Sequence, residues 1–228
     1  MAKNRRSKKK EEEILIDVVE VQEAAQNFFE KNQMKIVGAV GILVLLVGGF
    51  LAYKMLYQAP REKEAMTQMF KAEYQFQRDS FALALEGPGA GYSGLLDIID
   101  TYNGTKAANL CKYYAGISYL NLNRFDDAIQ YLSSYNEAGN VTSITKYGAI
   151  GDAESELGNF DAALSNYKKA SSGPANDMLT PYYLQKLGLL SYKQGDNSGA
   201  IAAFQQIKDD FPKSAEATDA EKYLGILQ

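Results

Sequence analysis

The side chains that could carry chemistry in this sequence are mainly carboxylates. They occur in three pairs at helical or adjacent spacing: Asp126/Asp127, Asp152/Glu156 and Asp209/Asp210. Paired carboxylates can act as general acid and base, but such pairs more often belong to solvated helix faces. The sequence has no His, which excludes a His-based catalyst, a catalytic triad and a Cys/His zinc site. We therefore expect no catalysis, no cofactor and no metal.

Two other features also argue against catalysis. Cys111 is the only cysteine, so it has no partner for an intrachain disulfide. Its helical surroundings favour a buried, small apolar side chain over the alternative, a reactive thiol. The Gly-rich stretch 87–94 follows a helical pattern and lacks the lysine of a phosphate-binding loop.

The charge distribution argues against nucleic acid as a partner. The net charge is −4, and residues 61–228 contain more Asp and Glu than Lys and Arg. Phosphate binding needs a basic surface, which this part of the chain lacks. A basic cluster at residues 3–10 lies upstream of an apolar run, where we interpret it as a topology or lipid-headgroup signal.

Residues 36–53 are predicted to form a transmembrane helix. The run contains no charged residue and is bracketed by Lys35 and Lys54. As a helix it would be about 27 Å long, close to the thickness of the bilayer core. It begins too far from the N-terminus for a signal peptide, and Phe50 occupies the −3 position of the best cleavage site, so we expect an uncleaved anchor.

The basic cluster predicts the orientation of this anchor. Lys and Arg are retained on the cytoplasmic side, which places the N-terminus inside and residues 55–228 outside the cytoplasm. Between the cluster and the span, residues 14–30 have apolar side chains at helical spacing. They are interpreted either as a short juxtamembrane helix or as a docking helix for a partner.

Small residues recur at regular intervals in the second half of the chain. Gly116, Gly151 and Gly188 are 35 and 37 residues apart, and Ala128, Ala163 and Ala200 repeat the same intervals. Each Gly and the Ala that follows it would be the points where two helices of a hairpin cross, since only small residues allow a close approach. The turns within the hairpins contain Asn123, Gly158 and Gly195, which tolerate a left-handed backbone. Pro212 follows the third hairpin.

The small residue, the turn and the following Asp-x-Ala pattern resemble the tetratricopeptide repeat (TPR) family. The resemblance implies an all-α fold in which one N-terminal transmembrane helix precedes an α-solenoid of helix-turn-helix repeats. It divides the chain into the segments 1–35 (basic cytoplasmic tail with a short amphipathic helix), 36–53 (transmembrane helix), 61–108 (degenerate helix pair capping the stack), 109–213 (three repeats) and 214–228 (C-terminal capping helix).

The resemblance also implies a concave groove formed by the first helix of each repeat. Counted from the aligned glycines, the residues expected to face the groove are Tyr113, Ile117, Leu120, Asn121, Asp152, Glu156, Tyr182, Gln185 and Tyr192. The tyrosines suit extended or helical peptides, because Tyr offers a large contact area at a low cost in conformational entropy. Asp152 and Glu156 would make the middle of the groove acidic.

An N-terminal anchor followed by such repeats resembles the ancillary subunits of the SecYEG translocon. We therefore expect a membrane-tethered scaffold or adaptor that binds proteins at the envelope, with a translocon, a periplasmic chaperone or an envelope complex as partner. The bilayer would be contacted through residues 36–53, in the cytoplasmic membrane. The alternative is a structural organiser of an envelope or division complex that acts through oligomerisation. Architecture alone does not determine the partner.

Overall fold

The computed structural model describes the backbone of residues 2–89, 91–173 and 176–227, and within these ranges the side chains from residue 26 onward. The described chain is all-helical, and its only β pairing is an isolated bridge between Gly89 and Tyr92. It divides into two compact units, Met1–Ala59 and Pro60–Gln228. Each unit is described by itself.

The first unit contains one long helix and the turn after it, and nearly all of its side chains from residue 26 onward are exposed. Helix α1 spans Ala2–Tyr53 and is followed by a π-helical turn, η1 (Lys54–Gln58). In the part of the chain with described side chains, one helical run, Gln26–Gln77, is long and apolar enough to cross a membrane. Its most apolar window has a mean hydropathy of 2.5, and none of that window is buried. The chain therefore has one candidate membrane helix near its N-terminus.

Helix α1 contains segments that the sequence analysis treated as separate. Residues 14–30 and 36–53 belong to one uninterrupted helix, so the juxtamembrane segment is not a helix of its own. No proline occurs before residue 60 to interrupt α1. The basic cluster at residues 3–10 lies outside the residues whose side chains are described.

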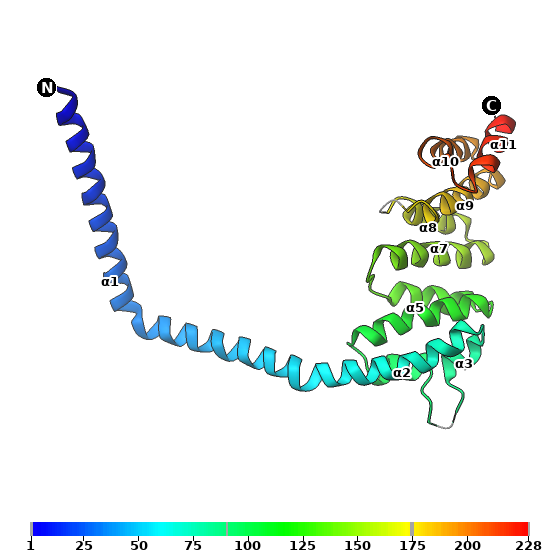
Figure 1. Ribbon diagram of the computed structural model, residues 1–228, viewed down its shortest axis with the longest axis horizontal. Coiled ribbons are helices and arrows are strands. Elements are labelled where there is room, and N and C mark those ends of the chain that lie inside the picture. The colour runs from blue at the N-terminus through cyan, green and yellow to red at the C-terminus, as the bar shows by residue number, and fades with distance from the viewer. Residues whose placement is uncertain (1, 90, 174–175, 228) are drawn as a thin grey trace. The chain divides into compact units, whose positions relative to one another are not determined.

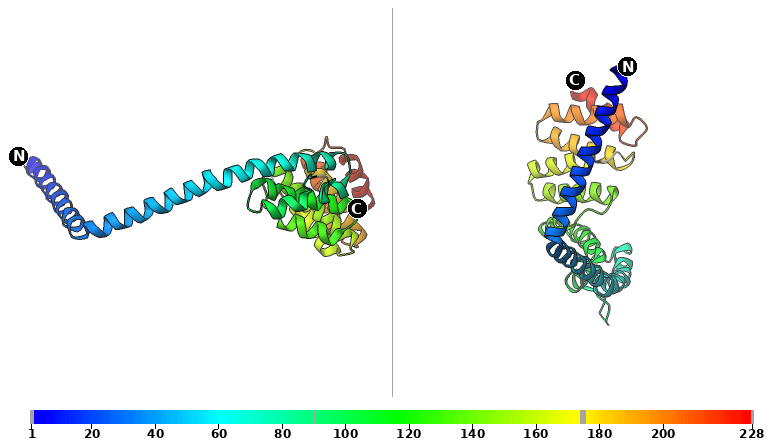
Figure 2. Two further views of the ribbon diagram at one scale, coloured as in Figure 1. Left: turned by 90° about the horizontal axis from the view of Figure 1, so that it is seen from below. Right: turned by 90° about the vertical axis from the view of Figure 1, so that its left-hand side faces the viewer.

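The second unit consists of ten helices in the described ranges. They are α2 (Ala59–Gln77), α3 (Phe81–Glu86), α4 (Leu95–Thr101), α5 (Lys106–Asn121), α6 (Phe125–Ser134), α7 (Asn140–Glu156), α8 (Phe160–Ser171), α9 (Leu179–Lys193), α10 (Asn197–Asp210) and α11 (Ala217–Leu227). From α4 to α11, each helix packs against the next one along the chain (Figures 1 and 2). In addition, α5 contacts α7 and α7 contacts α9.

The pairs α5–α6, α7–α8 and α9–α10 are joined by equivalent turns. Asn123, Gly158 and Gly195 have φ values of 58°, 80° and 79°, in the left-handed region that the turn sequences predict. The next amide in each turn donates to a carbonyl five residues earlier, for example Arg124 N–H to Tyr119 O at 2.9 Å. This is a Schellman motif, which satisfies the last carbonyls of the first helix. The same local chemistry therefore ends α5, α7 and α9.

Each of these pairs crosses at a glycine of the first helix, and a large side chain of the second helix packs against this glycine. Gly116 contacts Leu132, Gly151 contacts Tyr167, and Gly188 contacts Phe204. A Cβ at Gly151 would lie 2.7 Å from ring carbons of Tyr167, and one at Gly188 would lie 2.8 Å from Phe204. These distances are shorter than van der Waals contact, so a side chain at either glycine would push the helices apart.

The alanines of the repeated pattern lie on the second helix of each pair. Ala128, Ala163 and Ala200 are fully buried. The Ala163 carbonyl oxygen lies near Gly151, so α7 and α8 approach backbone to backbone there. Pro212 lies in the turn between α10 and α11, where its missing N–H breaks no helical hydrogen bond.

Residues 61–108 form three helices and the start of α5, where a helix pair was expected. Helix α2 ends at Gln77, and Asp79 adopts a left-handed φ of 56° before α3 begins at Phe81. In the Gly-rich segment between α3 and α4, Gly87 and Gly94 approach each other too closely for side chains.

Helix α2 is attached to the helices that follow through its first turn. The Glu62 carboxylate accepts hydrogen bonds from the backbone amides of Lys106 and Ala107 at 2.7 and 2.9 Å, and so caps the N-terminus of α5. Arg61 Nη2 donates to the carbonyl of Thr101 at the end of α4 at 2.6 Å. One turn of α2 therefore binds both sides of the α4–α5 junction.

We expect Ala163→Leu to destabilise the protein. The site is fully buried beside Gly151, and three additional carbons in a packed crossing cost about 1–3 kcal/mol. The measurement is chemical unfolding of the full chain in detergent, followed by circular dichroism. The control is Ala202→Leu on the exposed side of α10, which should change the unfolding free energy by less than about 0.5 kcal/mol. Equal stability of the two variants would contradict the assigned crossing.

Candidate functional site

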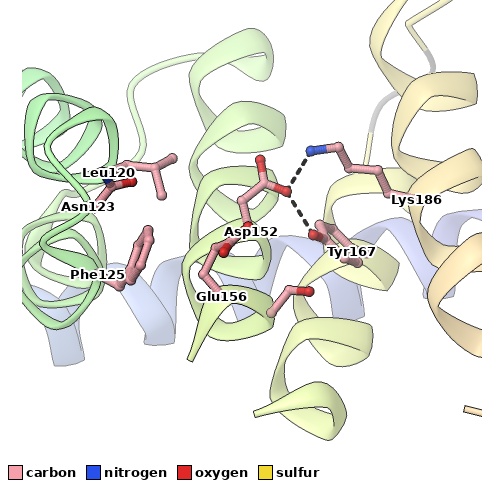
Figure 3. A pocket seen from close by; sticks show the side chains of 8 residues that line it. Leu120, Asn123, Phe125, Asp152, Glu156, Tyr167 and Lys186 are labelled. Carbon is pink, nitrogen blue, oxygen red and sulfur yellow. Dashed lines mark hydrogen bonds and ion pairs between the residues drawn. The ribbon is translucent and has the colours of Figure 1, made fainter. Parts of the chain in front are cut away.

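A polar pocket lies over the middle helices of the second unit. Its volume is about 400 Å³, and Figure 3 shows the side chains that line it. The lining residues come from α5 and the turn after it, from α6, α7, α8 and α9: Leu120, Asn123, Phe125, Asp152, Ser155, Glu156, Tyr167 and Lys186. Five consecutive helices therefore contribute to a single surface.

Asp152 holds the centre of this pocket together. Its Oδ1 accepts hydrogen bonds from the Tyr167 hydroxyl at 2.7 Å and from Lys186 Nζ at 2.6 Å (Figure 3). The Asp152 and Lys186 side chains are each 28% exposed. The ion pair is therefore only partly screened by water, and it connects α7 to both α8 and α9.

Tyr167 and Tyr183, which lie beside Asp152, remain neutral. Burial raises the pKa of Tyr167 well above its ordinary value, and the charge of Asp152 raises it further. Burial and the same carboxylate also raise the pKa of Tyr183, whose ring stacks on that of Tyr167 with centroids 6.5 Å apart. A tyrosinate next to Asp152 would place two negative charges in a half-buried site, which is unfavourable.

Lys186 stays charged although it is partly buried. Burial lowers the pKa of Lys186, but the hydrogen bond and the charge of Asp152 outweigh this effect and the net pKa is raised. Its ammonium group also lies 4.9 Å from the centroid of the Tyr182 ring, a cation–π contact. Tyr182 and Lys186 are one turn apart on α9, so they share a face.

The pocket offers acceptors for a positively charged or amide-bearing ligand. Both bonds of Asp152 end on Oδ1, so Oδ2 takes part in neither of them. Glu156 is exposed one turn further along α7, with Ser155 beside it. Leu120 and Phe125 form an apolar wall on the other side (Figure 3). This arrangement can accept hydrogen bonds from a side chain or from backbone amides and can contact apolar carbons at the same time.

Several of the residues expected to face a groove come together here. Leu120, Asp152 and Glu156 line the pocket. Tyr182 is 39% exposed and lies beside the pocket, where its ring contacts the ammonium group of Lys186.

The other expected groove residues make different contacts. The Tyr113 hydroxyl bonds Thr145 Oγ1 at 2.7 Å between α5 and α7. Ile117 is half-buried against the core, and its carbonyl accepts a bond from the exposed side chain of Asn121. Gln185 and Tyr192 are directed to α11. Gln185 Nε2 donates to Asp219 Oδ2 at 3.1 Å, and the Tyr192 ring lies 5.8 Å from that of Tyr223.

Neither Lys186 nor the hydroxyl contact of Tyr167 was predicted from the sequence. The Tyr167 ring lies in the core against Gly151, and its hydroxyl extends to Asp152. Lys186 is 34 residues from Asp152, and no local pattern connects them. The signal in the sequence was the spacing of Lys186 from Tyr182, which places a cation on the same helix face as an expected groove residue.

Comparison with known proteins identifies a family for most of the second unit. Residues 66–222 match the family described as T7SS, ESX-1 secretion system protein EccA1, N-terminal domain. The matched segment is more than half of the chain. Comparisons with curated proteins and with solved structures gave no match.

This match corrects the family inferred from the sequence. The matching family is the EccA1 domain, so the assignment to the TPR family was wrong, and so was the resemblance to ancillary SecYEG subunits. The physical reason is that small residues recur wherever paired helices cross closely at regular intervals. The spacing of Gly116, Gly151 and Gly188 therefore indicates repeated helix pairs but not the family to which they belong.

We expect Asp152→Asn to lower the free energy of unfolding by about 1–2 kcal/mol at pH 7, between the values typical of exposed and of buried ion pairs. The control is Asp127→Asn, because Asp127 pairs with Arg124 on the surface with exposures of 35% and 56%, where a loss below about 1 kcal/mol is expected. Equal losses would contradict a central role of Asp152.

The effect of Asp152→Asn should also depend on pH in a defined direction. Since the pKa of Lys186 is raised in the folded protein, the pair stabilises it fully at neutral pH. This stabilisation is lost as the pH rises above the ordinary lysine pKa of 10.5 and through the folded value. Unfolding measured from pH 7 to 11 should therefore show the wild type and the variant converging.

Proposed function

The chain belongs to the family of the EccA1 N-terminal domain, and we propose that it is a membrane-tethered protein-interaction module of a secretion system. The family is that of a secretion system protein, which is the basis for the functional context. The candidate membrane helix is the basis for tethering. The observation that carries the proposed binding activity is the pocket around Asp152, which five helices form together.

The helix pairs of the second unit form a solenoid in this proposal. Its support is the order of contacts: each helix packs on the next, and α5, α7 and α9 also contact one another in sequence. In a stack of helix pairs, the helices that are closest to their second neighbours line the concave side. The pocket, which draws most of its residues from α5, α7 and α9, would then lie in the concave groove.

The ligand of this groove is a segment of another protein. An open pocket with carboxylates on one wall and apolar carbons on the other suits a side chain with a cationic or amide end and an apolar stem. The exposed ring of Tyr182 extends the contact area beyond the pocket. Glu156 is the most accessible acceptor, because Asp152 already accepts a hydrogen bond from Lys186.

The proposal includes no catalytic step. The sequence has no His, and Cys111 is fully buried between helices. Burial, followed by the negative charge of Glu73, raises the pKa of the Cys111 thiol to about 12. A nucleophilic role for this thiol would need the opposite shift.

The second unit lies outside the cytoplasm in this proposal, with α1 crossing the cytoplasmic membrane. Its support is the basic cluster before the span, because Lys and Arg are retained on the cytoplasmic side. The binding partner would then be an extracytoplasmic protein or the exposed part of a membrane complex.

We expect a photo-crosslinking amino acid at Tyr182 to capture discrete proteins in intact membranes, and the same probe at Gln206 on α10 to capture none of them. Glu156→Gln should lower the yield at position 182 roughly tenfold, since a charge-assisted hydrogen bond contributes about 1.5–3 kcal/mol. Asp161→Asn, at an exposed acid at the start of α8, should leave the yield unchanged. Identical products from positions 182 and 206 would rule out this binding site.

Protease added to right-side-out spheroplasts should digest the second unit and leave an N-terminal membrane fragment of about 6 kDa, which corresponds to the residues up to the end of the span. A tag at the N-terminus identifies this fragment by immunoblot. A cytoplasmic protein serves as the control for intact membranes. Complete protection of the second unit until lysis would mean that the orientation is the reverse.

A further inference from the structure

Helix α2 has an exposed face that combines cations with large apolar side chains. We define the α2 outer face by Lys63, Met66, Phe70, Lys71, Tyr74 and Arg78, where Arg78 belongs to the turn after the helix. All six are exposed. Met66, Phe70 and Tyr74 follow one another at intervals of four residues, so they form a stripe along the helix. Their exposed fractions of 46, 63 and 56% are high for large apolar side chains.

The acidic residues of α2 are engaged with the helices on its other side. Glu62 accepts the backbone amides at the start of α5. Glu73 accepts a hydrogen bond from the Tyr114 hydroxyl at 3.0 Å. Burial, followed by the neighbouring Glu64 carboxylate, raises the pKa of Tyr102 at the end of α4. Glu62 and Glu73 are therefore directed to the stack, as is Arg61, whereas Lys63 and Lys71 lie on the outer face.

The cations of the outer face lie close to aromatic rings. Lys71 Nζ is 4.6 Å from the centroid of Tyr92, which extends from the Gly-rich loop. The Arg78 guanidinium lies 5.5 Å from the Tyr74 centroid and donates to the Tyr74 hydroxyl. Cationic and aromatic side chains on one helix face are the combination that lies at the interface of a bilayer, with the rings at the headgroup level.

The chain connects this face directly to the candidate membrane helix. Ten residues separate Tyr53 from Lys63, a distance of about 15 Å along a helix. The π-helical turn Lys54–Gln58 and Pro60 lie in this interval. Both a π-helical turn and a proline are features at which helices bend, because each removes or displaces backbone hydrogen bonds. The outer face is therefore held near the membrane surface on a segment that can turn toward it.

We propose that the α2 outer face binds the surface of a bilayer that contains anionic lipid. The apolar stripe enters the headgroup boundary, and Lys63, Lys71 and Arg78 contact the lipid phosphates. The remainder of residues 61–228 is acidic and is repelled by the same surface, so this contact also selects which side of the second unit faces the membrane. An acidic protein surface is the competing occupant, and tethering to a membrane favours lipid over it. This inference rests on the membrane anchor in the proposed function.

The protein contains no tryptophan, so single tryptophans can report on lipid contact without background. The experiment uses the full chain in nanodiscs of phosphatidylcholine, with and without phosphatidylglycerol, and a brominated lipid as quencher. Phe70→Trp should show a blue-shifted emission and strong quenching in the anionic discs and little of either in the neutral discs. Tyr192→Trp, on α9, should show neither effect in either disc.

Charge reversal tests the cations. In the Phe70→Trp background, Lys63→Glu, Lys71→Glu and Arg78→Glu together should reduce the quenching to the level of Tyr192→Trp, because each cation contributes roughly a fivefold preference for an anionic surface. The matched control reverses the exposed lysines Lys168, Lys208 and Lys213 instead, which changes the net charge equally, and should retain the quenching. Thermal unfolding of both triple variants verifies that they are folded.

The outcomes separate this inference from the anchor itself. Phe50→Trp reports on the candidate span, and its quenching in both kinds of disc establishes insertion. If Phe50→Trp is quenched and Phe70→Trp is not, the α2 outer face does not bind lipid. Equal quenching of Phe70→Trp in neutral and anionic discs, or quenching that survives the reversal of Lys63, Lys71 and Arg78, would equally overturn the inference. If Phe50→Trp is not quenched, the candidate span does not insert into the bilayer. The inference about the α2 outer face, which rests on this anchor, is then wrong as well.

Discussion

Three glycines at helix crossings set the geometry of the second unit. At Gly116, Gly151 and Gly188 a large side chain of the following helix lies directly on the backbone. The crossing at Gly151 also positions the binding site. It fixes the ring of Tyr167, and the hydroxyl of this ring reaches Asp152, the residue next to Gly151. Packing of the core and the polar chemistry of the pocket therefore depend on the same contact.

The pocket illustrates how a polar site can exist between packed helices. Asp152 is stabilised by two donors from two other helices, Tyr167 and Lys186. A half-buried carboxylate with a single partner would be costly, whereas a connected network offsets the loss of hydration. Because the network leaves Glu156 outside it and exposed, the site can bind a ligand without first breaking a contact that holds the fold together.

Much of the second unit could be predicted from local features of the sequence. The Gly and Ala intervals identified the crossings, and Asn123, Gly158 and Gly195 identified the left-handed turns, because both features depend on residues within one helix pair. The interruption between α2 and α3 was not predicted, because residues 61–85 contain neither Gly nor Pro. It occurs at Asp79, a residue type that tolerates a left-handed backbone but does not require it.

The candidate site was predictable only in part, for a physical reason. Asp152, Glu156 and Leu120 were identified because they lie on expected helix faces. The ion pair of Asp152 with Lys186 depends on the rotation and spacing of α7 relative to α9, which no local pattern specifies. The family could likewise not be predicted from the spacing of the small residues, because close crossings require small residues in any regular array of helix pairs.

The attachment of α2 to the α4–α5 junction has a mechanical consequence. The chain leaves the candidate membrane helix through η1 and enters the second unit at Arg61 and Glu62, and these two residues hold the end of α4 and the start of α5. A pulling force on the anchor would therefore load these hydrogen bonds before it reached the pocket. Because all three bonds hold the first turn of α2 on the α4–α5 junction, they would bear such a load together.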